Sequence, residues 1–328
     1  MVLKSRSAMS LFACFMFLFG QGFLSLSHAE EIHGTAANDD IIVTPATDCD
    51  GIIAYAGDDT VTVSAGAEVS AVSNDAYDSS ADAAATAIDT GTGNDSVQNN
   101  GTVSADAGTE VYAADVSGDA SGIISLDASA ASTATATGID AGGDSDTVFS
   151  TNPITALATA LAEVVNIGLQ LADATVVMAG VEAQATAVGI DAGDSGTEDP
   201  DEANTIVSTG PITATATSTA APSIANIQMY DFATASAQHE STATALGILG
   251  GGGADGITTS GPIEATASST GDSISVEGNL VDAGVADSGI ETTATATALS
   301  GLAGSDLISN TGTLTASATA NAEDISIN

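Results

Sequence analysis

Aspartate recurs in glycine-rich turns along this sequence, where its carboxylate and nearby carbonyl oxygens could bind a divalent cation. An Asp stands two residues before a β-branched or Leu residue in six places, and residues 250–258 read GGGGADGIT. Calcium takes about six to eight oxygen ligands, and it accepts Asp carboxylates and backbone carbonyls together. We therefore predict that Ca²⁺ binds at Asp40, Asp59, Asp95, Asp146, Asp255, Asp306, Gly250, Gly251 and Gly253.

The charge composition gives a reason to expect such cations. The chain has 43 Asp and Glu residues but only two Lys and Arg, at positions 4 and 6, and its net charge is −41. If the turns stack about 4.8 Å apart, neighbouring carboxylates repel by about 1 kcal/mol in water-like surroundings and by about 3–4 kcal/mol at an effective dielectric of 20. The alternative is that these are ordinary turns whose charges are solvated and screened by salt.

The same composition excludes two classes of partner. Nucleic acids and anionic membranes are bound mainly through Lys and Arg, and the chain has neither after position 6. The partners that we expect are divalent cations and, outside the cell, a polysaccharide or another surface protein.

The Asp-containing turns belong to a repeat of about 51 residues. Each copy has an apolar anchor before the turn, and the anchors are spaced by 51, 51, 58 and 51 residues: Ile88, Ile139, Ile190, Ile248 and Leu299. The longer spacing contains seven extra residues in an acidic loop at 194–202. Upstream, the copies are shorter, and we align Ile42 with Val61 and Val61 with Val97 as their corresponding apolar residues.

Each copy contains two stretches in which Ala or Ile alternates with Thr or Ser, and this period of two indicates β-strands. The chain has no Trp, four Tyr and seven Phe, which is too little bulk for an ordinary sandwich core. Stacked coils bury their inner faces on their neighbours and need less bulk. We expect an all-β fold, a parallel β-helix (β-solenoid) of about five 51-residue repeats. A β-propeller is the alternative, and each repeat could form one wide coil or two narrow ones.

Three segments follow from this pattern. Residues 1–29 read as a signal peptide, with a basic start, an apolar run and small residues before Glu30; a membrane anchor or a lipoprotein site at Cys14 are alternatives. Residues 30–85 form short N-terminal repeats that cap the solenoid. Residues 86–328 form the main solenoid, whose last repeat is incomplete.

Export and cysteine usage bear on the location and the oligomeric state. A signal peptide predicts a protein that is secreted or held at the cell surface of a Gram-negative bacterium, with the periplasm as the alternative. Its removal leaves Cys49 as the one cysteine, which predicts a reduced thiol or a disulfide-linked dimer.

The turns and the wider repeat resemble known families. GGGGADGIT fits the nonapeptide G-G-x-G-x-D-x-U-x at every defined position, and is similar to the calcium-binding turns of the RTX (haemolysin-type) family. The longer pattern is similar to the repeats of bacterial autotransporter passengers and repeat adhesins. RTX turns recur every nine residues, however, whereas these recur about every 51.

We expect a structural or adhesive surface protein that Ca²⁺ makes rigid. One alternative is a solenoid that binds a ligand or ice through its columns of Thr. The other is a carbohydrate-active β-helix enzyme, which the few aromatic residues and the lack of Lys and Arg disfavour. We therefore expect no enzymatic activity.

Overall fold

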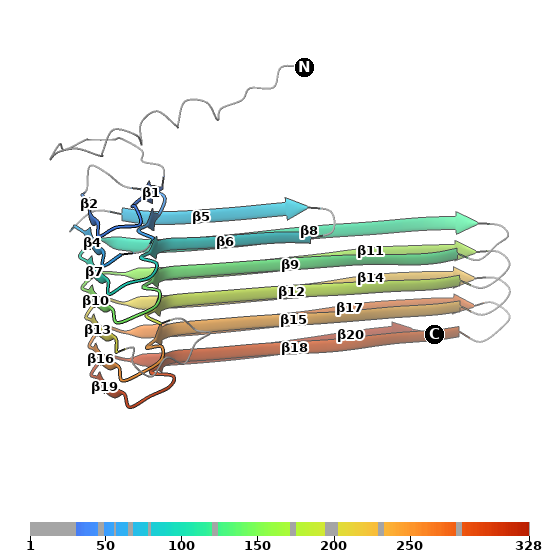
Figure 1. The fold of residues 1–328 in the computed structure, drawn as a ribbon. Helices are drawn as coiled ribbons and strands as arrows, with labels where there is room; N and C mark the ends of the chain where they lie inside the picture. Colours follow the sequence, from blue (N-terminus) through green and yellow to red (C-terminus); the bar gives the residue numbers. More distant parts are fainter. Residues whose placement is uncertain are drawn as a thin grey trace, which may run out of the picture.

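The computed structural model is a stack of coils made of parallel β-strands, and no helix occurs among the residues it describes (Figure 1). These are residues 31–44, 49–55, 57–64, 68–77, 80–119, 124–170, 175–193, 203–228, 233–279 and 284–327. The predicted signal peptide and the acidic loop at 194–202 lie outside the described residues. The expected all-β parallel solenoid is confirmed.

The strands form three parallel sheets. Sheet A contains β5 (Glu68–Tyr77), β8 (Thr102–Asp119), β11 (Ile154–Gln170), β14 (Ile212–Gln228), β17 (Ile263–Asn279) and β20 (Leu314–Ile327). Sheet B contains β1 (Ile32–His33), β3 (Ile52–Ile53), β6 (Ser80–Asp89), β9 (Ile124–Asp140), β12 (Thr175–Asp191), β15 (Ala233–Leu249) and β18 (Gly284–Ser300). Sheet C contains β2 (Asp40–Val43), β4 (Thr60–Val63), β7 (Ser96–Asn99), β10 (Thr147–Ser150), β13 (Thr205–Ser208), β16 (Gly256–Thr259) and β19 (Leu307–Asn310).

Each 51-residue repeat is one wide coil. The chain runs along a long strand of sheet B, crosses a short strand of sheet C and returns along sheet A. Thr175 of sheet B pairs with Ile124 in the coil before it and with Ala233 in the coil after it, so a single repeat separates the members of each pair.

Sheet C and the turns beside it make a three-sided end, called the head below. The long parts of sheets A and B make a flat extension, called the blade, whose far end is the tip (Figure 1).

Alanine fills the space between the two long sheets because they lie close together. The buried core of the blade is mostly Ala, whereas the largest fully buried side chains are Ile residues, many of them near the head. Hydroxyl groups also meet across the gap, since Ser218 Oγ lies 2.8 Å from Ser241 Oγ and Ser269 Oγ donates to the Ser241 carbonyl at 2.6 Å. Small side chains in strands, which run against the usual propensity, are thus explained by packing.

A glycine precedes the Ile or Leu anchor in three coils because an Ile of sheet A packs directly over it. A Cβ placed on Gly189 would lie 2.4 Å from Ile212 Cγ2 and 2.5 Å from the carbonyl oxygen of Gly247. Gly138 and Gly247 have the same crowded surroundings. These glycines let sheet A approach sheet B where the blade joins the head.

We expect Gly189→Ala to destabilise the solenoid by about 1–3 kcal/mol through overpacking. Gly143→Ala is the matched control, because a Cβ there would meet nothing within 4 Å and the residue has no positive φ. Thermal unfolding followed by circular dichroism measures both. Equal melting temperatures for the two variants would contradict this account of the Gly-Ile pair.

Candidate functional site

The recurrent Asp residues form a buried column along one edge of the head. Asp59, Asp95, Asp146 and Asp255 are each between 1 and 3% exposed, and Asn204 is 1% exposed. Each lies immediately before its sheet C strand. The in-register pairing of those strands places the five side chains above one another.

A continuous ladder of hydrogen bonds joins this column. The backbone N–H of each residue donates to Oδ1 of its counterpart in the next coil. The distances are 2.7 Å for Asp39 to Asp59, 2.6 Å for Asp59 to Asp95, 2.8 Å for Asp95 to Asp146, 2.8 Å for Asp146 to Asn204, 2.8 Å for Asn204 to Asp255, and 3.1 Å for Asp255 to Asp306. The column therefore has a structural role, because its hydrogen bonds connect each coil to the next.

The predicted position Asp40 is not in this column. Asp40 pairs with Thr60 in β2 and β4, and Asp39 stands in line with Asp59. Two adjacent Asp residues and two adjacent Ile residues allow either alignment in the sequence, and Val61 pairs with Ile41 rather than with the predicted Ile42. The first coil is thus one residue longer than the sequence predicted. Asp59, Asp95, Asp146, Asp255 and Asp306 are brought together as expected.

Asn204 shows what the second oxygen of each carboxyl group needs. Its Nδ2 donates to the Gly250 carbonyl oxygen at 2.8 Å, so this side chain serves as acceptor and donor at once. In Asp59 and Asp95 the atom at that place is Oδ2, which is buried without a hydrogen-bond partner among the described residues. A carboxyl group can supply the missing donor only when it carries a proton.

The pKa values move in the direction that this environment dictates. Burial raises the pKa of the Asp59 carboxyl, although the Asp39 N–H lowers it, and the charges of Asp39 and Asp58 raise it further. Burial likewise raises the pKa of Asp95, against the Asp59 N–H and the nearby Thr90 hydroxyl, and the charges of Asp59 and Asp58 add to the rise. At Asp59 and Asp95 the environment therefore shifts the balance toward the neutral carboxyl group.

The residues of the column do not fit a calcium ion. One oxygen of each carboxyl accepts a backbone N–H, and the amide –NH₂ of Asn204 interrupts the series with a donor that repels a cation. Within the described ranges, no group of three or more His, Cys, Asp or Glu side chains is placed to hold a metal ion. Calcium coordination at these turns remains a prediction without support from the geometry.

The turn glycines have a steric role in this arrangement. A Cβ on Gly250 would lie 2.7 Å from Asp255 Oδ2, so only glycine leaves room for the carboxyl group there. Gly251 and Gly253 have φ values of +97° and +89°, in the left-handed region that favours glycine. The three residues predicted as carbonyl ligands are accounted for by the turn itself.

A second ladder runs along the exposed side of the same turns in the opposite direction. Asn94 N–H donates to Asp58 Oδ1 at 3.0 Å, Ser145 N–H to Asn94 Oδ1 at 3.3 Å, and Ala203 N–H to Ser145 Oγ at 3.0 Å. The sequence analysis missed these residues. The polar residue just before most of the column residues was the available signal.

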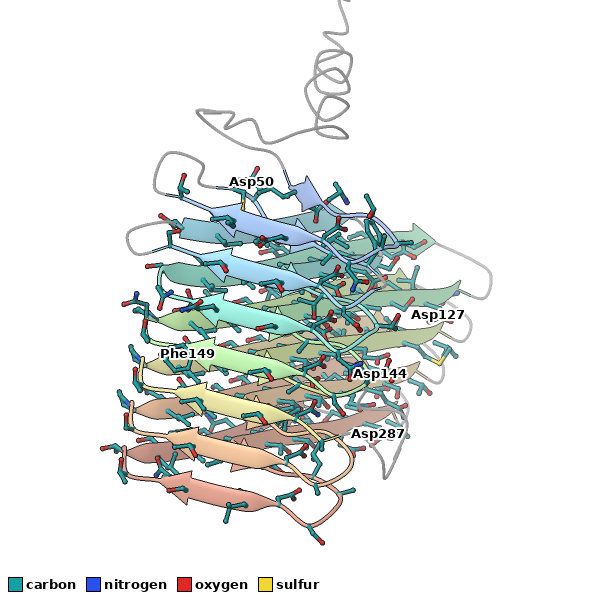
Figure 2. All side chains as sticks on the ribbon, turned by 60° about the vertical axis from the view of Figure 1, so that its left-hand side comes forward. Asp50, Asp127, Asp144, Phe149 and Asp287 are labelled. Carbon is teal, nitrogen blue, oxygen red and sulfur yellow. The ribbon has the colours of Figure 1, made fainter. Side chains whose placement is uncertain are left out.

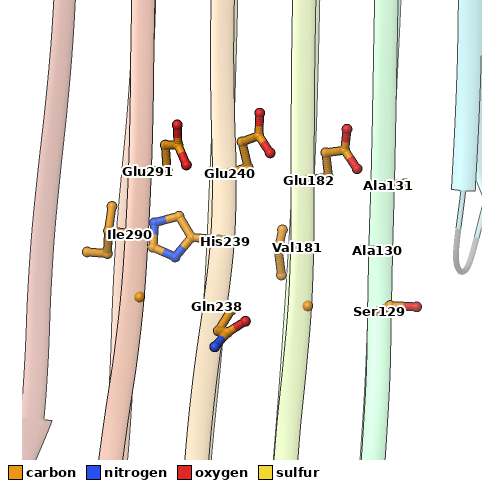
Figure 3. A pocket seen from close by; sticks show the side chains of 12 residues that line it. Ser129, Ala130, Ala131, Val181, Glu182, Gln238, His239, Glu240, Ile290 and Glu291 are labelled. Atoms are coloured by element: carbon orange, nitrogen blue, oxygen red, sulfur yellow. The ribbon is translucent and has the colours of Figure 1, made fainter.

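Among the described residues, sheet B carries a shallow groove on its outer face, of about 590 Å³. Glu182, Glu240 and Glu291 stand side by side along it (Figure 3), in register on β12, β15 and β18. None of its lining residues is Phe, Tyr or Trp, so it has no aromatic platform for a sugar ring. Behind it lies the buried His239, whose pKa burial lowers.

Cys49, for which the sequence predicts a reduced thiol or a disulfide-linked dimer, is buried, with 3% of its surface exposed, and forms no disulfide within the described part of the chain. A disulfide with another copy would require this part of the first coils to open. The dimer remains a prediction.

Comparison with known protein families, curated proteins and solved structures finds no match to this chain. The described residues include no helix with the length and apolarity needed to cross a bilayer.

We expect Asp95→Asn to stabilise the protein at pH 7 by about 1–3 kcal/mol, because the amide keeps the acceptor and supplies a permanent donor. A carboxyl whose pKa is raised on folding loses its contribution to stability as the pH rises from the unfolded pKa of about 3.9 through the folded pKa. The gain should therefore be small at pH 3.5. Melting temperatures at both pH values measure it.

The matched control is Asp127→Asn, which removes the same charge from an exposed position (Figure 2). A gain at pH 7 that is no larger for Asp95→Asn than for Asp127→Asn would show that only the net charge matters. The ladder would then play no part in the pH dependence.

Because the column does not fit calcium, we expect the same melting temperature in 1 mM EGTA and in about 2 mM CaCl₂, at equal ionic strength. Magnesium at the same concentration is the control for general screening of the carboxylates. A rise specific to calcium that Asp255→Asn abolishes would restore the predicted calcium site.

Proposed function

We propose that this chain is an exported structural or adhesive β-solenoid that acts outside the cell or at its surface. The observation that carries the proposal is the uninterrupted stack of coils. Hydrogen-bond ladders join the turns of successive coils, and the broad outer faces repeat similar side chains from coil to coil. Such a fold supports an extended, regular surface, because each repeat packs only on its neighbours. The signal-peptide pattern at 1–29 supports export.

The outer faces fit contact with a macromolecule better than catalysis. They display rows of Thr, Ser, Glu and Asp on flat sheets, and the groove described above is open and has no aromatic lining. An extracellular polysaccharide or another surface protein is the expected partner. The structure and the composition give no support to a carbohydrate-active enzyme.

The threonine alternative rests on a single complete row. Thr135, Thr186, Thr244 and Thr295 are in register on four strands of sheet B. On sheet A, the row that begins with Thr155 and Thr213 is interrupted by Glu264. A regular lattice such as ice needs a wider array, so this reading stays secondary.

Expression of the full chain with a C-terminal epitope tag, beside a variant that lacks residues 2–29, tests the proposal. We expect the full chain in the surface or culture-medium fraction with its N-terminus at Glu30, and the shortened chain inside the cell. Protein at the surface should be digested when proteinase K is added to intact cells. Proteinase K is used instead of trypsin because the chain has no Lys or Arg after position 6. An unprocessed chain that stays in the cytoplasm would contradict the proposal.

A further inference from the structure

The outer face of sheet A near the tip carries a cluster of exposed apolar side chains, called the tip patch below. Its members are between 41 and 65% exposed: Val116, Val165, Leu169, Ile227, Ile274 and Ile325. They come from five neighbouring strands, β8, β11, β14, β17 and β20. The register pairs Leu169 with Ile227 and Ile274 with Ile325, whereas Ser223 stands between Val165 and Ile274. Exposed apolar patches of a few hundred Å² are often functional.

At the tip the usual distribution of polarity is reversed. Asn166, Asn226 and Glu277 point inward and are at most 2% exposed, whereas the residues beside them in each strand point outward and are apolar. The inward amides have a structural task, since Asn226 Nδ2 donates to the Thr234 carbonyl of sheet B at 3.0 Å and Asn166 Nδ2 donates to that of Met178. No such task within the described residues explains the outward apolar side chains.

The size of the tip patch fits a single helix better than a second copy of the sheet. Five strands about 4.8 Å apart span about 19 Å, and the rows from Val165 to Leu169 span about 13 Å along the strands. This gives an area of roughly 250 Å², below the roughly 800 Å² per partner of a stable interface. A helix of about 10–12 Å diameter and about 13–16 residues covers such an area.

Charge indicates the chemistry of that helix. A row of acidic side chains, Glu163, Asp272 and Glu323, borders the tip patch on the side facing the head, two residues before the apolar row. The chain has no Lys or Arg beyond position 6 to pair with them. A second copy would bring the same charge of −41, whereas a helix with Lys or Arg along one flank would neutralise this border.

We propose that the tip patch is the docking site of a basic amphipathic helix of another protein. The helix lies across the strands, parallel to the stack. Its apolar face covers the tip patch, and its basic flank meets Glu163, Asp272 and Glu323. The proposal does not depend on export or on adhesion.

The test uses a synthetic helical peptide of about 16 residues, with Leu on one face and Lys on the other, and a scrambled peptide of the same composition. Fluorescence anisotropy at about 0.15 M salt measures binding to the full chain. We expect the scrambled peptide to bind at least tenfold more weakly. If the two peptides bound equally well, binding would depend only on the net charge of the chain, and the proposal would be overturned.

Two sets of variants locate the site. We expect Leu169→Thr with Ile227→Thr and Ile274→Thr to weaken peptide binding at least tenfold, while the control set Ile42→Thr, Met178→Thr and Val285→Thr, at other exposed positions, leaves it unchanged. Glu163→Gln with Asp272→Asn should weaken binding several-fold more than Asp127→Asn with Asp287→Asn. Circular dichroism confirms that each variant folds.

Two further measurements distinguish a helix from the two other possible occupants of the tip patch, a second copy of the chain and a lipid surface. Sedimentation velocity of the chain alone should show a monomer, and a dimer that the Thr variants abolish would assign the tip patch to a second copy. Co-sedimentation with phosphatidylcholine vesicles should be absent, and binding that depends on the tip patch would assign it to a lipid surface. Either result would overturn the proposal.

Discussion

In-register stacking of parallel coils is the constraint on which the rest of the structure depends. It sets each residue directly against its counterpart in the coil before and after, so every local choice of side chain is repeated along the stack. Favourable choices such as Ala in the blade reinforce one another. Unfavourable choices, above all a carboxylate on a carboxylate, accumulate in the same way unless something at each level relieves them.

The chain relieves its stacked carboxyl groups with hydrogen bonds rather than with opposite charges. Backbone N–H groups, which an edge turn would otherwise leave to water, supply a donor to one oxygen of every member of the column. The Asn204 amide is neutral at every pH, and burial raises the pKa values of Asp59 and Asp95 toward the same neutral state. The same carboxyl group therefore supports the fold and makes the fold sensitive to pH.

Much of the fold could be predicted because its signals are periodic. The regular spacing of the anchors and the alternation of Ala with Thr follow directly from one wide coil, and the one longer copy appears as the same coil with a longer connection. The sequence could not show how sheets A and B close on each other, or that Gly189 is needed because Ile212 lies over it. The predicted register of the first coil was wrong by one residue. Either member of Asp39-Asp40, and either member of Ile41-Ile42, can be aligned with the next coil in the sequence.

The sequence predicted the position of most of the Asp column, and calcium binding there remains a prediction. A Gly-Asp turn reads the same whether its carboxylate faces a cation or accepts an N–H from the preceding coil, since the difference lies in a contact one full repeat away along the chain. The tip patch escaped notice for the opposite reason. Its Val, Leu and Ile residues look like ordinary strand interior, and only the structure shows which face of the blade they occupy.

The wide coil has a consequence for how the molecule can change in size. Each coil adds about 4.8 Å to the stack and leaves the cross-section, the column and the outer rows as they were. A gene that gains or loses a segment encoding one whole repeat would therefore alter the reach of the protein in fixed steps. Length would then vary between related chains by whole coils, while the pattern displayed to a partner stays constant.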